Sequence, residues 1–299
     1  GLDEANRRVT ISGCGGRPSE GPMSVQTGLG GTTTRFVTAA CALGRGTYRI
    51  DADPGMRSRT MAELFEALRV LGAGIEHEEQ PGHLPVRLEA SGLEGGRVQL
   101  AGDTSSQFVT ALLLVAPWAS GPVQLEVTGE LVSAPYVRLT GEVLAAFGAS
   151  VDRLGHGAYR IEPTGCSGTE YTVEGDASAA SYPAAAAAIV GGRVKISGIG
   201  AGSAQGDMKF FECSSQMGVD VEIASDHVVV ERKGRLNAIE ADLRDCSDLA
   251  PTLAVVAAVA EGTSRLTGIG FIRAKESDRL GDLAGELRKA HRLGAVGAH

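Results

Sequence analysis

A glycine that directly follows the last apolar residue of an amphipathic stretch recurs along the chain, as Gly72, Gly148, Gly218 and Gly294. The successive spacings are 76, 70 and 76 residues. Glycine readily takes the left-handed conformation with which many helices end. A period of this length is too long for a solenoid repeat, so the pattern predicts a repeated subdomain with a surface helix ending at each glycine.

Each repeat is also predicted to contain a second helix and several strands. Apolar residues at helical spacing, such as Leu64, Leu68 and Leu71, mark the surface helices. Ala-rich segments with little polar surface come earlier in each repeat, and a helix that is apolar all round is expected to be buried. These segments span 35–43, 107–117, 179–190 and 248–260, and alternating residues at 123–127, 194–196 and 219–223 predict strands.

Strands with helices between them place the chain in the α/β (α+β) class. With 299 residues, 43% of them hydrophobic, the chain is long enough for two domains with their own cores. The Gly-containing stretch at 164–168 is typical of a loop between domains. We therefore expect a first domain over 1–172 and a second over 173–299.

Composition and charge exclude several classes of function. The net charge is −8 and there is no run of Lys and Arg, whereas duplex nucleic acid requires a basic face. The histidines are scattered without ligand spacing, so no metal site is expected. The most apolar stretches, 183–191 and 249–260, are far shorter than the roughly 20 residues that span a bilayer. A small anionic substrate is still compatible, because a few convergent Arg and Lys make a local positive pocket.

The cysteines are odd in number and far apart, and they form no CxxC pair. Free thiols in a reducing compartment are the simplest interpretation. We therefore expect a cytoplasmic protein without a membrane partner, and we expect a monomer.

Four polar segments are candidates for chemistry, and each has a structural alternative. The loop 28–35 leads into a buried helix, where free N–H groups attract anions, but it also suits an ordinary capped helix start. Segment 103–107 offers hydroxyls and an amide to a ligand, or helix capping. Segment 273–280 holds a candidate proton-transfer pair, Lys275 and Glu276, and a candidate anion clamp, Arg279; alternatively Ser277 or Asp278 caps a helix. Asp248 is a possible base, or an N-cap.

Taken in order, five strings of the chain resemble the EPSP synthase family. The likeness runs from about residue 20 to about residue 289. The strings are Gly-Gly-Thr-Thr-Thr-Arg at 30–35, Ser-Ser-Gln-Phe-Val-Thr-Ala-Leu-Leu at 105–113, Leu-Val-Ser-Ala-Pro-Tyr at 131–136, Val-Glu-Gly-Asp-Ala-Ser at 173–178 and Lys-Glu-Ser-Asp-Arg-Leu at 275–280.

The resemblance implies two similar domains of repeated βαβαββ subdomains, which close over the substrates. The enolpyruvyl transferase fold would be incomplete here, with at most four of six subdomains. The implied reaction is the transfer of the enolpyruvyl group of phosphoenolpyruvate to the 5-hydroxyl of shikimate 3-phosphate with release of phosphate. This step belongs to the shikimate pathway of aromatic amino acid and chorismate biosynthesis, and it uses no cofactor.

The resemblance also implies roles for single residues. Asp248 would be the base for the attacking hydroxyl, and Lys275 and Glu276 would transfer protons. Substrate contacts would come from Gly31, Thr32, Ser105, Ser106, Gln107, Ser133, Tyr136 and Arg279. Gly55 stands where the family often carries an Arg, so Arg57 or Arg59 would supply that charge, and Arg57 is the residue that we place in the site.

Three further departures from the family accompany these likenesses. The family's N-terminal Lys-Ser-x-x-x-Arg and C-terminal Asp-His-Arg segments are missing, so we expect little or no turnover from this chain alone. Leu29 replaces a frequent Asn, and Phe36 replaces a frequent Pro. The competing interpretations are a UDP-N-acetylglucosamine enolpyruvyl transferase, whose reactive Cys has no counterpart at 54–57, a non-catalytic fragment or binding module of the same fold, and a terminal-phosphate cyclase.

Overall fold

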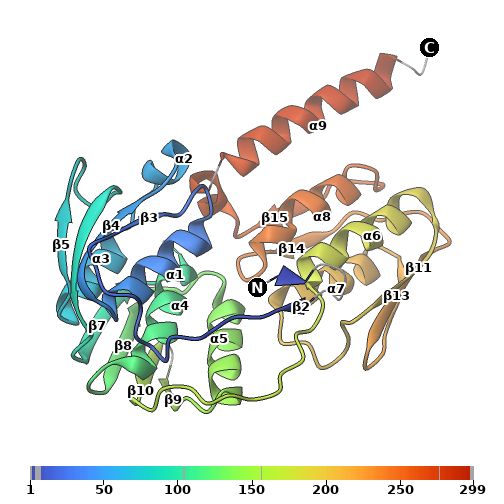
Figure 1. Ribbon diagram of the computed structural model, residues 1–299. Helices are drawn as coiled ribbons and strands as arrows, with labels where there is room; N and C mark the ends of the chain where they lie inside the picture. Colours follow the sequence, from blue (N-terminus) through green and yellow to red (C-terminus); the bar gives the residue numbers. More distant parts are fainter. Residues whose placement is uncertain (1, 4–7, 104, 156, 276, 297–299) are drawn as a thin grey trace. The chain divides into compact units, whose positions relative to one another are not determined.

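The computed structural model describes residues 2–3, 8–103, 105–155, 157–275 and 277–296. The predicted mixture of helices and strands is confirmed, and the elements follow one another in repeats (Figure 1). The first repeat contains β3 (Met23–Gln26), α1 (Gly31–Ala42), β4 (Arg45–Asp51), α2 (Pro54–Arg57), α3 (Ala62–Val70), β5 (Gly74–His77) and β6 (Val86–Ser91). The second contains β7 (Gly96–Ala101), α4 (Ser106–Val115), η1 (Ala116–Trp118), β8 (Val123–Thr128), α5 (Ala134–Ala146), β9 (Val151–Gly155) and β10 (Ala158–Ile161).

These two repeats have the same sheet topology. The strand orders are β3-β4-β6-β5 and β7-β8-β10-β9. In each sheet the first pair is parallel and the other pairs are antiparallel. The parallel pair is the one connected through a buried helix, α1 or α4, as a parallel connection requires.

The later repeats are less regular. A three-stranded antiparallel sheet has the order β11-β13-β12, and β14 pairs with β15 in parallel. The third repeat contains α6 (Ala177–Val190), β11 (Gly192–Ser197), η2 (Gly206–Met208), α7 (Lys209–Gln216), β12 (Asp220–Ile223) and β13 (His227–Arg232). The fourth contains β14 (Glu240–Asp242), η3 (Ser247–Leu249), α8 (Ala250–Ala257), β15 (Arg265–Thr267), η4 (Gly270–Ala274) and α9 (Arg279–Val296), and a short ribbon pairs β1 (Leu2–Asp3) with β2 (Arg8–Val9).

Three of the four repeating glycines end helices as predicted. Gly72, Gly148 and Gly218 have φ values of 104°, 79° and 92°, in the left-handed region. The fourth prediction was wrong, because α9 continues through Gly294 to Val296. A single glycine inside a helix costs only about 1 kcal/mol relative to Ala, so it does not by itself stop a helix.

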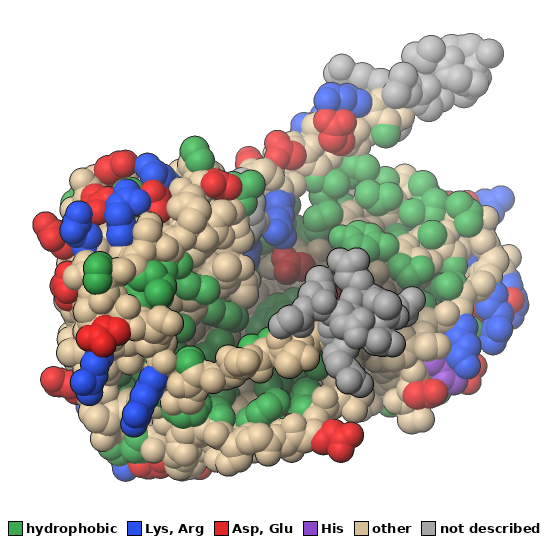
Figure 2. Space-filling model, in the orientation of Figure 1, with side chains coloured by type: hydrophobic (Ala, Val, Ile, Leu, Met, Phe, Trp, Pro, Cys, Tyr) green, Lys and Arg blue, Asp and Glu red, His purple; other side chains and the backbone are tan. Residues whose placement is uncertain are grey.

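The expected burial of the Ala-rich helices is only partly correct. Helices α1 and α4 are largely buried, but α6 and α8 each expose an apolar side. Tyr182 and Val190 of α6 are 64% and 79% exposed, and Val255 of α8 is 41% exposed. Hydrophobic side chains gather on the surface over these two helices (Figure 2). Composition predicts that such a helix packs against other apolar groups, but it does not predict how many sides of the helix are covered.

By their internal contacts the residues divide into two compact units. Unit 1 contains 1–101, 107–129 and 140–169, and unit 2 contains 102–106, 130–139 and 170–299. The domains expected from the sequence, 1–172 and 173–299, are defined differently from these units and stay a prediction. In the described ranges, no helix combines the length and the apolar character needed to cross a membrane. The cysteines are free, and Cys41, Cys213 and Cys246 are buried.

Candidate functional site

Two buried arginines of unit 1 lie at the start of α1. A Cβ atom added to Gly31 would lie 2.6 Å from Nη1 of Arg59 and 3.4 Å from Nη1 of Arg35. Arg35 and Arg59 are only 3% and 9% exposed. The N-cap residue, Gly30, makes no side-chain hydrogen bond to the helix, so the capped start proposed as an alternative is not formed by a side chain. Two cations beside a helix N-terminus favour an anion at this position.

A glutamine from α4 completes this cluster. Arg35 donates from Nη1 to Oε1 of Gln107, and Gln107 donates from Nε2 to Oγ1 of Thr32 over 3.1 Å. The guanidinium of Arg35 also lies 4.7 Å from the ring centroid of Phe108. The structure therefore brings together three residues expected from the sequence, Gly31, Thr32 and Gln107, and adds Arg35 and Arg59. We call these five residues the anion cluster.

Arg57, the arginine that we placed in the site from the sequence, makes different contacts. Its Nε and Nη2 donate to Oδ1 and Oδ2 of Asp51 over 2.8 and 2.7 Å. Its Nη1 lies 3.1 Å from a carboxylate oxygen of Glu79. The sequence offered Arg59 only as the alternative to Arg57, and it missed Arg35 although that residue ends the Gly-Gly-Thr-Thr-Thr-Arg string. The signal for Arg35 was its place one helical turn after the glycine loop.

We expect Gly31→Ala to weaken anion binding without unfolding the chain. The new methyl group would meet the Arg59 guanidinium at 2.6 Å and push it from the cluster, whereas Ala is a good helix former. Calorimetric titration with inorganic phosphate measures the effect. The matched control is Gly141→Ala in α5, where a Cβ meets nothing within 4 Å. Unchanged affinity in Gly31→Ala would contradict the assignment of the cluster.

In unit 2 a half-buried tyrosine pairs with a buried aspartate. Tyr136 of α5 donates its hydroxyl to Oδ2 of Asp207 over 2.5 Å, and Asp207, in η2, is 2% exposed. Burial raises the pKa of the Asp207 carboxyl, and the nearby carboxylates of Asp248 and Asp176 raise it further. The pKa of Tyr136 is also raised, first by burial and then by Asp207. The sequence predicted Tyr136 but missed Asp207, which lies in no recognisable motif.

Asp207→Asn is expected to make the protein more stable at pH 7. Because the folded-state pKa of Asp207 is raised above its unfolded value, stability is lost as the pH rises through the interval between the two values. The amide removes this loss and can still accept the Tyr136 hydrogen. Urea unfolding between pH 4.5 and 7.5 should show a gain for the variant that grows with pH. A variant less stable than the wild type at every pH would contradict this.

Of the serines predicted to contact substrate, Ser133 is placed by a tight backbone turn. Ser133 is 7% exposed and has a φ of 55°, an uncommon value for a residue with a Cβ. Its N–H donates to the carbonyl oxygen of Arg244 over 3.2 Å, which fixes the turn before α5. Ser105 and Ser106, at the start of α4, are also buried. Strained turns of this kind occur preferentially at functional sites.

An ion pair joins two further predicted residues of unit 2. Nη1 of Arg279 lies 2.7 Å from Oδ1 of Asp248. Helix α8 has Leu249 as its N-cap and no side-chain cap hydrogen bond, so the alternative role of Asp248 as an N-cap is not realised. Nζ of Lys275 lies 5.6 Å from the ring centroid of Phe271. Glu276, the other predicted proton-transfer residue, lies outside the described residues.

The alternative capping role predicted for segment 273–280 is confirmed for Asp278. Oδ1 of Asp278 accepts a hydrogen bond from the N–H of Gly281 over 2.9 Å, and Oδ2 lies 2.7 Å from Nη1 of Arg273. The hydrogen bond from Gly281 is the main cause that lowers the pKa of Asp278. The segment therefore contains both a helix cap and two candidate functional cations.

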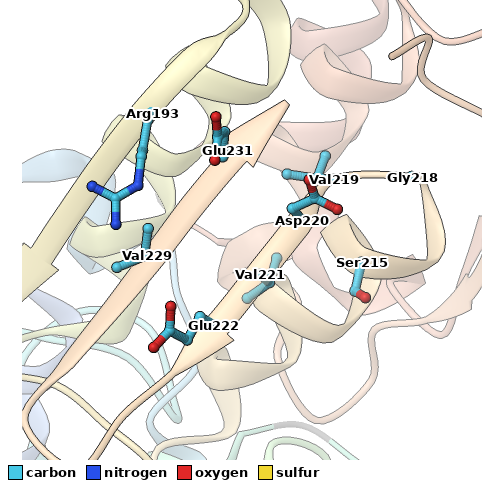
Figure 3. A pocket seen from close by; sticks show the side chains of 9 residues that line it. All are labelled: Arg193, Ser215, Gly218, Val219, Asp220, Val221, Glu222, Val229 and Glu231. Carbon is cyan, nitrogen blue, oxygen red and sulfur yellow. The ribbon is translucent and has the colours of Figure 1, made fainter. Parts of the chain in front are cut away.

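One pocket of unit 2 offers less to an anion than the anion cluster does. A pocket over β12 and β13 is lined by Arg193 together with Asp220, Glu222 and Glu231, so acidic groups predominate (Figure 3). Among the described residues, no group of three or more His, Cys, Asp or Glu side chains is arranged to hold a metal ion.

Comparisons with known proteins agree with one another. The model of the family EPSP synthase (3-phosphoshikimate 1-carboxyvinyltransferase) matches residues 1–295. The 3-phosphoshikimate 1-carboxyvinyltransferase of Shewanella halifaxensis is 41% identical over 302 residues, which cover 99% of this chain and 69% of the relative. The protein of the same description from a Sulfurovum species is 43% identical over 295 residues, which cover 96% of this chain and 68% of the relative.

Solved structures of EPSP synthase from Acinetobacter baumannii have the same fold. One has a TM-score of 0.69 at 25% identity, over 88% of this chain and 61% of that one. The other has a TM-score of 0.71 at 23% identity, over 91% of this chain and 61% of that one. The chain thus spans less than two thirds of the length of these solved chains.

Proposed function

Because the chain belongs to the EPSP synthase family, we propose that it takes part in the transfer of an enolpyruvyl group from phosphoenolpyruvate to the 5-hydroxyl of shikimate 3-phosphate. The observation that carries this proposal is the anion cluster of unit 1. Two buried guanidinium groups and a helix N-terminus suit a ligand with both phosphate and carboxylate groups, and phosphoenolpyruvate is such a ligand. A cytoplasmic location and a monomeric state belong to the same proposal.

The polar groups of unit 2 suit the second substrate, which has ring hydroxyls as well as a phosphate. Carboxylates accept hydrogen bonds from hydroxyls but repel phosphate. We therefore assign Asp248 and the Tyr136–Asp207 pair to the ring hydroxyls. The hydroxyls of Ser105, Ser106 and Ser133 are assigned to the phosphate.

The proposed reaction is an addition followed by an elimination. Asp248 takes the proton of the attacking 5-hydroxyl, whose oxygen bonds to C2 of phosphoenolpyruvate. Lys275, with Glu276, delivers a proton to the methylene carbon. Loss of a proton from the new methyl group then re-forms the double bond as phosphate leaves. Arg279, which pairs with Asp248, is assigned as an anchor for phosphoenolpyruvate.

The proposal is tested by titrating the chain with phosphoenolpyruvate and with shikimate 3-phosphate in separate calorimetric experiments. We expect saturable binding of both, weakened by salt because the ligands are anions. UDP-N-acetylglucosamine serves as the control ligand. Preference for that nucleotide sugar over shikimate 3-phosphate would replace the proposal with the related transferase activity.

A further inference from the structure

The loop that precedes Arg59 in the sequence is closed by an ion pair. Asp51 is the last residue of β4 and Arg57 is the last residue of α2. The guanidinium of Arg57 binds both oxygens of the Asp51 carboxylate, over 2.8 and 2.7 Å. Such a two-pronged contact fixes orientation as well as distance. Residues 52–56 between the two partners thus form a closed loop.

Asp51 makes several hydrogen bonds in this region of unit 1. Its Oδ1 also accepts the N–H of Ala52 over 2.7 Å, and its side chain is nearly buried, at 10% exposure. Its backbone carbonyl accepts both the N–H and the hydroxyl of Thr27, over 3.0 and 3.1 Å. Thr27 directly precedes the glycine loop that leads to Gly31. Asp51 therefore connects two of the segments that supply the anion cluster.

Arg59 lies two residues after Arg57, and a backbone hydrogen bond ties it to α2. The N–H of Arg59 donates to the carbonyl oxygen of Met56, in α2, over 3.0 Å. A shift of α2 would therefore be transmitted to Arg59, whose guanidinium approaches Gly31 closely. Burial acts to raise the pKa of the Asp51 carboxyl, but hydrogen bonds from Arg57, Ala52 and Arg49 lower it below its ordinary value. The carboxylate is thus the form that the loop stabilises.

We propose that Asp51 and Arg57 form a latch that positions Arg59 in the anion cluster, and that Arg57 is a positioning residue that does not itself bind substrate. This inference rests on the proposed function, because it assumes that the cluster binds an anion. It also replaces the role that the sequence suggested for Arg57. The guanidinium of Arg57 is already engaged by Asp51 and Glu79.

Asp51→Asn distinguishes a latch from a direct ligand, because the two roles predict opposite signs. If Arg57 bound the anion directly, removing its carboxylate partner and one nearby negative charge would leave the affinity unchanged or raise it. A latch predicts that the affinity of the 299-residue chain for phosphoenolpyruvate falls, by roughly 5- to 20-fold. Calorimetric titration at fixed ionic strength measures this change, and inorganic phosphate is the second probe.

Three companion variants complete the test. Arg57→Ala should lower the affinity to a similar extent, and the double variant Asp51→Asn/Arg57→Ala should bind no more weakly than either single one. Arg57→Lys keeps the charge but loses the two-pronged contact, so a latch predicts weaker binding here too. Arg49→Ala is the control, because Arg49 also contacts Asp51, over 3.1 Å, but lies on β4 and does not close the loop.

Unchanged or tighter binding in Asp51→Asn, together with weaker binding in Arg57→Ala, would overturn the latch and make Arg57 a ligand. Circular dichroism checks that each variant is folded, and if Asp51→Asn is not, Asp51→Ser takes its place because it also removes the carboxylate partner of Arg57. Arg59→Ala separates this inference from the proposed function. If that variant binds phosphoenolpyruvate normally, the anion cluster itself is misassigned; if it binds weakly while Asp51→Asn binds normally, only the latch fails.

Discussion

Asp248→Ala and Lys275→Ala are each expected to lower the rate of phosphate release from phosphoenolpyruvate by roughly 100-fold or more, as lost proton transfer does. The rate is measured in a chain completed with the terminal segments of the Shewanella halifaxensis relative, of which this chain covers 69%. Asp248 would take the hydroxyl proton and Lys275 would supply the proton to carbon, and water cannot replace either group in a fixed position.

Two further variants separate chemistry from folding in this experiment. Asp248→Asn keeps the shape of the side chain but removes its basicity, so it should be as slow as Asp248→Ala. Lys289→Ala removes an exposed cation that pairs with Glu286 within α9, and it should leave the rate unchanged. Near-normal rates in Asp248→Ala or Lys275→Ala would mean that the residue has another role.

Arg59→Ala is expected to weaken the binding of phosphoenolpyruvate by roughly 10- to 100-fold. A hydrogen bond from a buried charged group contributes about 1.5–3 kcal/mol, and each 1.4 kcal/mol corresponds to a tenfold change in affinity. The salt dependence of binding should also become less steep, because one cation is lost.

The control for Arg59→Ala is Arg97→Ala, which removes an equal charge from unit 1. Arg97 is 63% exposed in its side chain and contacts Glu126 on the surface of the sheet. We expect this variant to bind phosphoenolpyruvate as the wild type does. Equal loss of affinity in both variants would indicate a general charge effect instead of a site at Gly31.

Local patterns were sufficient to predict most of the helices and the three strands β8, β11 and β12. The turn glycines Gly72, Gly148 and Gly218 and the alternating strand at 123–127 are short-range signals, and the structure confirms them. The exposed sides of α6 and α8 were not predictable in this way. Their composition is the same on all sides, so only tertiary packing decides which side is covered.

The candidate site residues that the sequence missed depend on contacts between neighbouring repeats. Arg35 meets Gln107, 72 positions later, and Tyr136 meets Asp207, 71 positions later. These separations equal about one repeat of the sequence, so equivalent positions of successive repeats come together. A motif search along the chain cannot find such pairs, whereas the repeat length identifies where to look for them. The sequence could not decide between Arg57 and Arg59, because the two arginines lie two residues apart. Only their side-chain contacts in the structure distinguish them.

The most direct test of the central claim is phosphorus NMR of phosphoenolpyruvate titrated with the folded chain, compared between wild type and Arg59→Ala. We predict that the phosphate resonance shifts or broadens saturably with the wild-type chain and responds far less with the variant. A resonance that the wild-type chain leaves untouched, or that both proteins change equally, would contradict the assignment of an anion site at the start of α1.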